Sequence, residues 1–470
     1  TMKEISKESI DQVVLFINNS ELHKAKKKIN EYLKVNPQLD VLHNLHGTIL
    51  LKQEKFGKSI DVLKTALSIN PNFVSAMQNL GIAYQKLGYY DESLKCFEDA
   101  INLKPELSSA HNNKGSILIR QRNDLGAITC LKKALELDSN NADAYFNLGV
   151  IHQSQKNYSE AILFYKKATG LDNNFVAAYF TMGETYRLLN NYKEALDCYI
   201  RSRHRKTNAR ILECLLVLGM KDEYTKQIKK ISKKDPYNTW VAAVNSFLSQ
   251  QFRIKNYHPF CPDPLELLYQ TNLIKYFEDF DKFSQELYDE MIQQKFVWAP
   301  YGKTEVNGYS TMENLSDLKL PKLSVLEKMI LKEINLYRKH HKNKSCDLIR
   351  KWPKRFKLYI WCVRLQKEGY NENHIHPSGW LSGVFYLKIP TKIKDKEGGL
   401  ECSLHGENFK IVRNYVPTKF FPPKVGNLTL FPSSLYHKTI PFHSEEERVA
   451  IAFDVIRHNN EVWKAEQFGD

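Results

Sequence analysis

Hydrophobic positions in the first half of the chain recur with helical spacing, and the helical segments themselves repeat every 34 residues. A glycine marks each repeat, at Gly47, Gly81, Gly115, Gly149 and Gly183. A second small residue follows each glycine after 12 residues and a third after 19. Small residues at these points allow two antiparallel helices to approach closely, and Pro37, Pro71 and Pro105 fall where a helix must end. The pattern predicts a stack of helical hairpins.

One complete unit reads "FVSAMQNLGIAYQKLGYYDESLKCFEDAINLKP" and resembles the tetratricopeptide repeat. Regular units cover residues 38–207, with one degenerate unit before them and another after them, "LLVLGMKDEYTKQIKKISKKDP". We therefore expect a tetratricopeptide-repeat domain over residues 1–207, followed by a degenerate helical repeat and linker over 208–271. The resemblance implies an all-α superhelix whose concave groove holds a protein or peptide.

Three asparagines stand two residues before their repeat glycine, at Asn79, Asn113 and Asn147. In tetratricopeptide proteins this position faces the groove, so the resemblance implies that these amides bind a peptide backbone. The alternative is that asparagine is simply common at this position. Cysteines that share another repeat position, Cys96, Cys130 and Cys198, are interpreted as packing residues.

The hydrophobic period changes after the proline-broken segment "YHPFCPDPLELL" at residues 257–268. A helical pattern, "LSVLEKMILKEINLY", precedes five short runs with strand character: "KLYIWCVRL", "LSGVFYLKI", "LECSLHG", "NLTLFP" and "RVAIAFDVI". Glycine, proline and charged turns separate these runs at a spacing typical of all-β folds. The sequence therefore predicts a double-stranded β-helix, or jelly roll, with flanking helices over residues 272–470.

Two segments of this second half carry candidate metal ligands. In "NENHIHPSGWLSGVFYLKIP", His374 and His376 stand two residues apart, a spacing that turns both rings to one side of an extended chain. In "GNLTLFPSSLYHKTIPFHSEEERVAIAF", we expect a strand to end at Pro432, His437 to lie in the following turn and Arg448 to begin the next strand. Three imidazoles on one face would leave the other positions of a metal ion open.

Together these segments resemble the Fe(II)/2-oxoglutarate-dependent oxygenases, and more narrowly a family sometimes fused to tetratricopeptide repeats. The resemblance covers roughly residues 358–456. It implies Fe(II), 2-oxoglutarate and O₂ as cofactor and cosubstrates, with succinate and CO₂ as products of 2-oxoglutarate. Arg448 would grip the distal carboxylate of 2-oxoglutarate with its two-pronged guanidinium. Tyr386 is our candidate for the hydroxyl that shares this carboxylate, with Tyr359 and Ser382 as alternatives.

The superfamily pattern has Asp or Glu where this chain has His376. Three interpretations remain open: all three histidines bind iron, one of His374 and His376 joins His437 with water in the vacancy, or three imidazoles bind zinc. A neutral or vacant position also leaves halogenation open. The cupin alternative is disfavoured because Trp380 and Leu381 occupy the places of its usual glutamate. His405, His443 and the pair His340–His341 are read as surface residues or neighbours of the ligands.

Composition narrows the class of protein. The chain has 470 residues, 42% of them hydrophobic, and no apolar run approaches the ~18 residues of a membrane span. Its eight cysteines form no CxxC pair, which favours a reducing compartment, and we expect a cytoplasmic protein. The net charge is +15, and residues 338–357 alone hold nine Lys/Arg against one Asp. This basic segment indicates a rim around a site for acidic ligands or, with Trp352 and Phe356, a nucleic-acid contact.

The function we expect is hydroxylation of a protein or peptide that the repeats present to the jelly roll. One alternative is a 2-oxoglutarate oxygenase directed at nucleic acid, suggested by the basic segment. The other is a non-enzymatic tetratricopeptide scaffold with a cupin-like metal-binding domain.

Overall fold

The computed structural model describes residues 5–203, 207–298, 304–406 and 409–457. The chain divides into two compact units between Thr185 and Tyr186. Each unit is described separately below. Within the described ranges, no helix combines the length and apolar character needed to cross a membrane.

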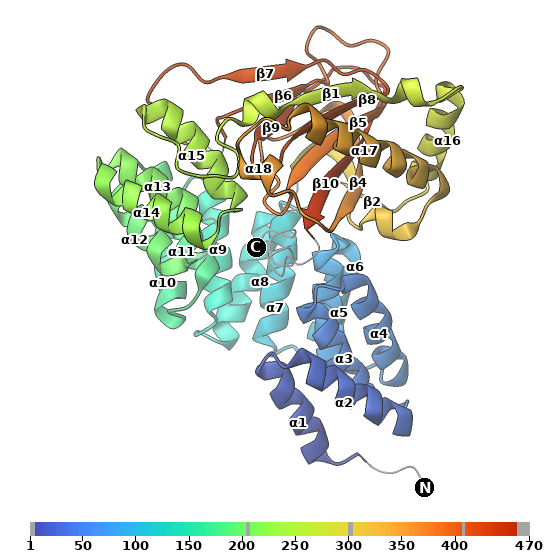
Figure 1. The fold of residues 1–470 in the computed structure, drawn as a ribbon. Helices are drawn as coiled ribbons and strands as arrows, with labels where there is room; N and C mark the ends of the chain where they lie inside the picture. Colours follow the sequence, from blue (N-terminus) through green and yellow to red (C-terminus); the bar gives the residue numbers. More distant parts are fainter. Residues whose placement is uncertain (1–4, 204–206, 299–303, 407–408, 458–470) are drawn as a thin grey trace. The chain divides into compact units, whose positions relative to one another are not determined.

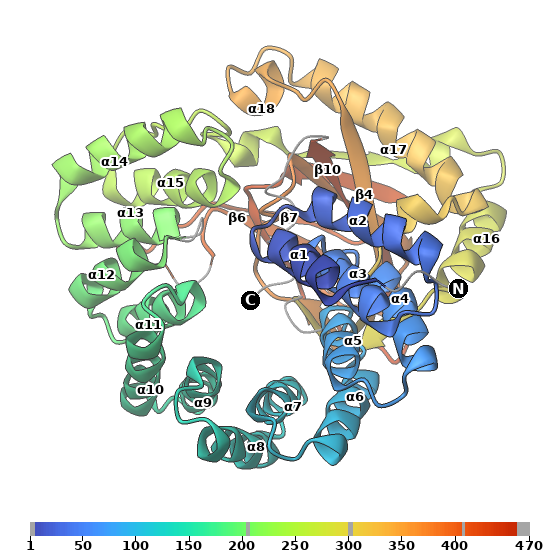
Figure 2. The ribbon, with the colours of Figure 1, turned by 90° about the horizontal axis from the view of Figure 1, so that it is seen from below.

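The first unit is built from antiparallel helix pairs (Figure 1). From α3 to α10, helices of 13 and 14 residues alternate, and Figure 2 shows α5 to α10 succeeding one another along a curve, as the predicted superhelix requires. The helices are α1 (Lys7–Asn18), α2 (Leu22–Val35), α3 (Asp40–Lys52), α4 (Phe56–Ile69), α5 (Val74–Lys86), α6 (Tyr90–Leu103), α7 (Ser108–Arg120), α8 (Asp124–Leu137), α9 (Ala142–Ser154), α10 (Tyr158–Leu171) and α11 (Val176–Leu188), the last of which continues past the division.

The repeat glycines lie where the second helix of each pair places a large side chain. A Cβ atom on Gly149 would lie 2.5 Å from the ring of Tyr165, and one on Gly47 would lie 2.5 Å from Leu63. The small residue 12 positions later also serves the contact, because Ser59 Oγ donates to the Gly47 carbonyl at 2.9 Å. The 34-residue pattern therefore encodes the close approach of the two helices.

This close approach predicts the effect of adding one methyl group. We expect Gly149→Ala to destabilise the repeats by about 1–3 kcal/mol, because its Cβ would overlap the buried Tyr165 ring. The matched control is Gly170→Ala in α10, where no atom lies within 4 Å of the added Cβ. That change should be neutral or stabilise by up to about 1 kcal/mol. Thermal unfolding followed by circular dichroism measures both, and equal effects would contradict the packing role of Gly149.

The second unit begins with helices and continues into a β-rich domain. The helices of its first part are α12 (Tyr192–Ser202), α13 (Thr207–Val217), α14 (Lys221–Lys234) and α15 (Thr239–Phe252). The structure groups them with the β-rich domain. The domain boundaries expected from the sequence, after residues 207 and 271, stay predictions.

The β-rich domain consists of two antiparallel sheets, as the predicted jelly roll requires. The larger sheet has the strand order β1-β8-β5-β10-β4-β3-β2 and the smaller has the order β7-β6-β9. The strands are β1 (Tyr269–Asn272), β2 (Phe296–Trp298), β3 (Glu305–Thr311), β4 (Phe356–Asn371), β5 (Leu381–Lys388), β6 (Leu400–Ser403), β7 (Thr418–Phe421), β8 (Asn427–Pro432), β9 (Tyr436–Thr439) and β10 (Arg448–Arg457). The remaining helical segments are η1 (Pro264–Leu267), η2 (Leu273–Tyr276), η3 (Leu315–Leu318), α16 (Phe280–Ile292), α17 (Pro321–His340) and α18 (Asp347–Arg350).

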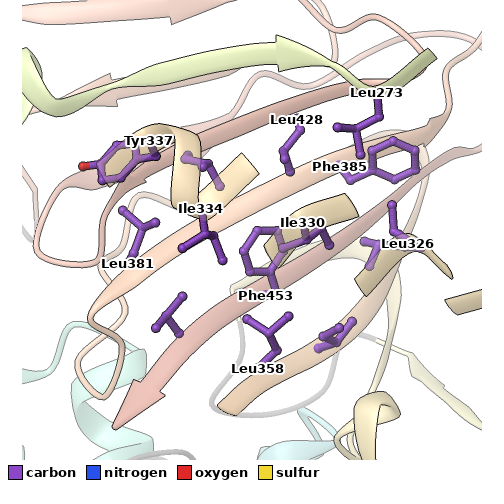
Figure 3. Close-up of a cluster of buried hydrophobic side chains, with 14 of the residues drawn as sticks. Leu273, Leu326, Ile330, Ile334, Tyr337, Leu358, Leu381, Phe385, Leu428 and Phe453 are labelled. Carbon is purple, nitrogen blue, oxygen red and sulfur yellow. The ribbon is translucent and has the colours of Figure 1, made fainter. Parts of the chain in front are cut away.

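Helix α17 covers the outer face of the larger sheet (Figure 3). Its buried residues Leu326, Ile330 and Ile334 recur every four positions and form one apolar stripe. They belong to the same buried cluster as Phe385 of β5 and Phe453 of β10. Burying one apolar side chain of this kind contributes about 1.5–3 kcal/mol to the free energy of folding. The main core of the domain thus lies between α17 and the outer face of the larger sheet, and the inner face of this sheet is available for polar residues.

The five predicted strands correspond to β4, β5, β6, β8 and β10, and the predicted helix corresponds to α17. One local expectation was wrong: His437 lies in strand β9, where it pairs with Cys402 of β6, and not in a turn. Strand β9 has only four residues, and its partner lies more than 30 residues earlier in the chain. Such a short, non-local pairing leaves no periodic signal in the sequence.

Candidate metal centre

Backbone hydrogen bonds bring the two histidine segments together. The amide of His374 donates to the His437 carbonyl, and the amide of His437 donates to the His374 carbonyl, both at 3.0 Å. The His376 amide donates to the Ser433 carbonyl at 2.9 Å. The main chain therefore holds the three candidate ligands in register, independently of contacts between their side chains.

Each of the three rings is oriented by a hydrogen bond at Nδ1. The acceptors are the Glu372 carbonyl at 2.6 Å for His374, Asp454 Oδ1 at 2.5 Å for His376 and the Leu435 carbonyl at 3.1 Å for His437. A proton on each Nδ1 leaves the Nε2 lone pair free to bind a metal.

The ligand atoms converge. Nε2 of His374 and Nε2 of His376 are 3.1 Å apart, and one ring nitrogen from each of the three histidines lies within 4.8 Å of the others. Burial and the two neighbouring imidazoles lower the pKa of His437 well below its usual value, so this ring is neutral. Neutral imidazole is the form that binds a metal. The group is therefore suited to hold one ion.

A carboxylate stands directly behind the ligands. Asp454 of β10 is 8% exposed, and its Oδ1 also accepts a hydrogen bond from Ser382 Oγ at 2.6 Å. Ser382 in turn lies 2.8 Å from Ser433 Oγ. The superfamily pattern has a carboxylate at the position of His376. In this chain the carboxylate is that of Asp454, which is hydrogen-bonded to His376. Sequence analysis missed Asp454, although a charged residue within the apolar run "RVAIAFDVI" is a usable signal.

Arg448 and Tyr386 form a second buried polar pair. Arg448 is 2% exposed, its Nε donates to the Gly398 carbonyl at 2.9 Å, and its guanidinium carbon lies 4.8 Å from the centre of the Tyr386 ring. No ion pair joins Arg448 to an acidic side chain of the described residues, and the Tyr386 hydroxyl has no hydrogen-bond partner among them. Burial raises the pKa of Tyr386 more than the neighbouring Arg448 guanidinium lowers it, so the hydroxyl keeps its proton. A carboxylate bound here would satisfy both groups.

The Arg448–Tyr386 pair and the Asp454–Ser382 pair lie on the inner face of the larger sheet. Because side chains alternate along a strand, Arg448 and Asp454 of β10 point to the same face, and only Ala450 and Ala452 lie between them on that face. Tyr386 pairs with Ala450, while Ser382 pairs with Asp454. The Arg448–Tyr386 pair and the Asp454 carboxylate that holds His376 therefore lie on one face of the sheet, separated along β10 by two alanines.

Of the three hydroxyls considered from the sequence, Tyr386 is the one that contacts Arg448. Ser382 lies beside His376, where it bonds Asp454. Tyr359 is opposite Asp454 in the β4–β10 pairing, and its hydroxyl donates to the Met312 carbonyl at 3.2 Å.

The other histidines lie outside the three-histidine group. His405 Nε2 is 2.9 Å from the Phe409 carbonyl, and exposed His443 bonds Glu397. His340 is exposed at the end of α17, whereas burial lowers the pKa of His341 to about 4. The basic segment spans the end of α17, α18 and the start of β4, with most of its Lys and Arg exposed.

Two of the three asparagines predicted to bind a peptide, Asn79 and Asn147, make hydrogen bonds to the preceding repeat. Asn79 Nδ2 donates to Asn44 Oδ1 at 2.8 Å, and Asn147 Nδ2 donates to Asn112 Oδ1 at 2.9 Å. Asn113 accepts a longer bond of 3.5 Å from Asn112. Sequence analysis missed Asn44 and Asn112, which both stand three residues before a repeat glycine. Asn79 and Asn147 therefore stabilise the stacking of neighbouring repeats.

Comparison with known proteins finds repeat families in the first half of the chain and another family in the second half. A family model described as "Putative 2OG-Fe(II) oxygenase" matches residues 359–454. Tetratricopeptide-repeat models match residues 47–88, 74–107, 120–156, 142–175 and 176–202. No curated protein matches the chain.

Several solved structures are similar in part. MamA is 25% identical with a TM-score of 0.28, covering 33% of this chain and 91% of its own. PilF of Pseudomonas aeruginosa is 16% identical with a TM-score of 0.38, covering 45% of this chain and 97% of its own. YrrB, described as a TPR protein with an unusual peptide-binding site, is 20% identical with a TM-score of 0.28, covering 37% and 90%.

Fold and site together define a tetratricopeptide-repeat protein with a three-histidine centre inside a β-sandwich. The β-sandwich is a domain of the 2OG-Fe(II) oxygenase family.

The Asp454–His376 hydrogen bond predicts how the centre binds metal. We expect Asp454→Asn to lower Fe(II) affinity about 10–100-fold, because His376 loses its anionic partner while the shape of the residue is kept. The matched control is Glu397→Gln, which alters the carboxylate beside His443, outside the centre. Anaerobic calorimetric titration with Fe(II) measures the affinities. Equal affinity of wild type and Asp454→Asn would show that the carboxylate does not tune the centre.

Proposed function

We propose that the protein is an Fe(II)- and 2-oxoglutarate-dependent dioxygenase that hydroxylates a protein or peptide substrate and forms succinate and CO₂. One observation carries the proposal: the three histidines gather at Asp454, which lies on the same face of β10 as Arg448 of the buried Arg448–Tyr386 pair. The histidines suit a metal, and the pair suits the far carboxylate of a diacid. A site for a metal ion alone would have no use for the second group.

The chain's own residues would perform three tasks. The three imidazoles would hold Fe(II) from one side, which when bound activates O₂ together with the 2-oxo acid. Arg448 and Tyr386 would orient 2-oxoglutarate by its distal carboxylate. Trp361, whose ring lies 5.5 Å from that of His376, and Phe431, 4.4 Å from that of His437, would keep water from the centre.

We favour ligation by all three histidines over a two-histidine site. Each ring has its own Nδ1 acceptor, and His376 has the strongest one, a buried carboxylate. A residue held in this way is suited to be a ligand. Zinc with three imidazoles remains the alternative metal, and it would leave the Arg448–Tyr386 pair without a role.

The repeats would supply the substrate. Tetratricopeptide arrays commonly bind extended or helical peptides along their concave face. Asn79 and Asn147 already donate to the preceding repeat, so we expect a bound peptide to meet the oxygen atoms of these amides, together with Asn113.

Turnover without added substrate tests the activity and the ligands. Purified wild type, supplied with Fe(II), O₂ and 2-oxoglutarate at high protein concentration, should form succinate, whereas His376→Ala and His437→Ala should form none. Succinate from His376→Ala alone would indicate a two-histidine site. No succinate from iron-loaded wild type would favour the scaffold or cupin-like alternatives.

The Tyr386 hydroxyl provides a sharper test of the cosubstrate site. Tyr386→Phe removes an unpaired buried hydroxyl, so stability without 2-oxoglutarate should be unchanged or slightly higher. The KM for 2-oxoglutarate should rise about 5–10-fold, equivalent to roughly 1 kcal/mol for one lost hydrogen bond. The matched control Tyr359→Phe should lower stability by about 1 kcal/mol and leave this KM unchanged. The reverse pattern would assign the cosubstrate hydroxyl to Tyr359.

A further inference from the structure

The helices α13–α15 share one buried core with the segments that carry the histidines. The cluster contains Leu212, Trp240, Val244 and Phe247 of these helices. It also contains Ile375, which stands between His374 and His376, and Tyr436, which stands next to His437. Both are at most 4% exposed. The residues adjacent to all three candidate ligands are therefore buried against the helices.

Polar contacts fix the same segment from the start of α15. Thr239 Oγ1 donates to the Pro377 carbonyl at 2.7 Å, directly after His376. Just before α15, the Tyr237 ring packs on Trp380, with ring centres 5.1 Å apart. The Trp380 amide donates to Val455, the residue after Asp454. These contacts hold the His376 segment at its C-terminal side.

The N-terminal side of the segment is held through a second route. Asn373 Nδ2 donates to the His405 carbonyl at 2.8 Å, and the His405 ring packs on Phe247 of α15 with ring centres 5.0 Å apart.

The loop after β6 is also tied to these helices. Gln251 Oε1 accepts from the amides of Val412 and Arg413 at 2.9 and 2.8 Å. Buried Glu213 of α13 accepts from the Lys410 amide at 3.1 Å. This loop carries Phe409, which belongs to the shared core.

We propose that α13–α15 are a positioning element of the metal centre, which they fix through Thr239, Ile375 and Tyr436. The inference rests on the proposed metal site. It makes the degenerate repeat a working part of the oxygenase domain, in contrast to a catalytic domain that begins at residue 272. Thr239 touches neither metal nor substrate and acts through the Pro377 carbonyl.

The test uses the full chain and Co(II), which replaces Fe(II) and has visible absorption that reports its ligands. Thr239→Val keeps the side-chain shape but loses the donor, and it should weaken Co(II) binding on the order of tenfold and alter the absorption bands. Thr239→Ser restores the donor and should restore both. The matched control Thr225→Val removes a hydroxyl that bonds the Lys221 carbonyl within α14, and it should leave both unchanged.

A second measurement needs no variant. Hydrogen exchange of wild type should show slower exchange in residues 239–252 as well as 371–377 when Co(II) binds, because metal binding stabilises everything coupled to its ligands. Wild-type affinity in Thr239→Val, or equal losses in Thr225→Val, would overturn the inference, as would protection confined to the β-rich domain. Wild type that binds no Co(II) would instead overturn the proposed metal site.

Discussion

Strand β10 imposes the main constraint on the oxygenase domain, because it is hydrogen-bonded on both sides and buried on both faces. Its outward residues Val449, Ile451 and Phe453 complete the core beneath α17. Its inward residues include Arg448 and Asp454, which serve the two halves of the candidate site. A register slip of one residue would exchange the two faces, so the same pairing that builds the core also places the site chemistry.

The charge of the metal centre follows from this placement. Three neutral imidazoles leave the full charge of a divalent ion uncompensated, in contrast to a set that contains a carboxylate ligand. Asp454 would supply the missing negative charge through His376, and its hydrogen bond from Ser382 makes a buried carboxylate tolerable. A metal held here would have a neutral ligand at the position where the superfamily pattern has an anionic one.

The sequence predicts the structural features that leave a periodic pattern or a short motif of functional residues. The 34-residue period predicts the helical hairpins, and the spacing around His374, His376 and His437 predicts a metal-binding group that the structure brings together. What it does not predict depends on contacts between distant residues. Strand β9 is too short for a pattern, and Asp454 acquires its role only when β10 lies opposite β5. The pairing of Asn79 with Asn44 likewise depends on the stacking of neighbouring repeats.

The degenerate repeat shows why weak similarity does not mean a loose connection. A repeat array must end in a helix that tolerates solvent on its outer side. Helix α15 cannot serve as such an end, because ten consecutive residues, from Thr239 to Leu248, are buried. A helix that is buried on all sides needs a partner on each side. It has α13 and α14 on one side and the β-rich domain on the other, and these two partners together account for its burial.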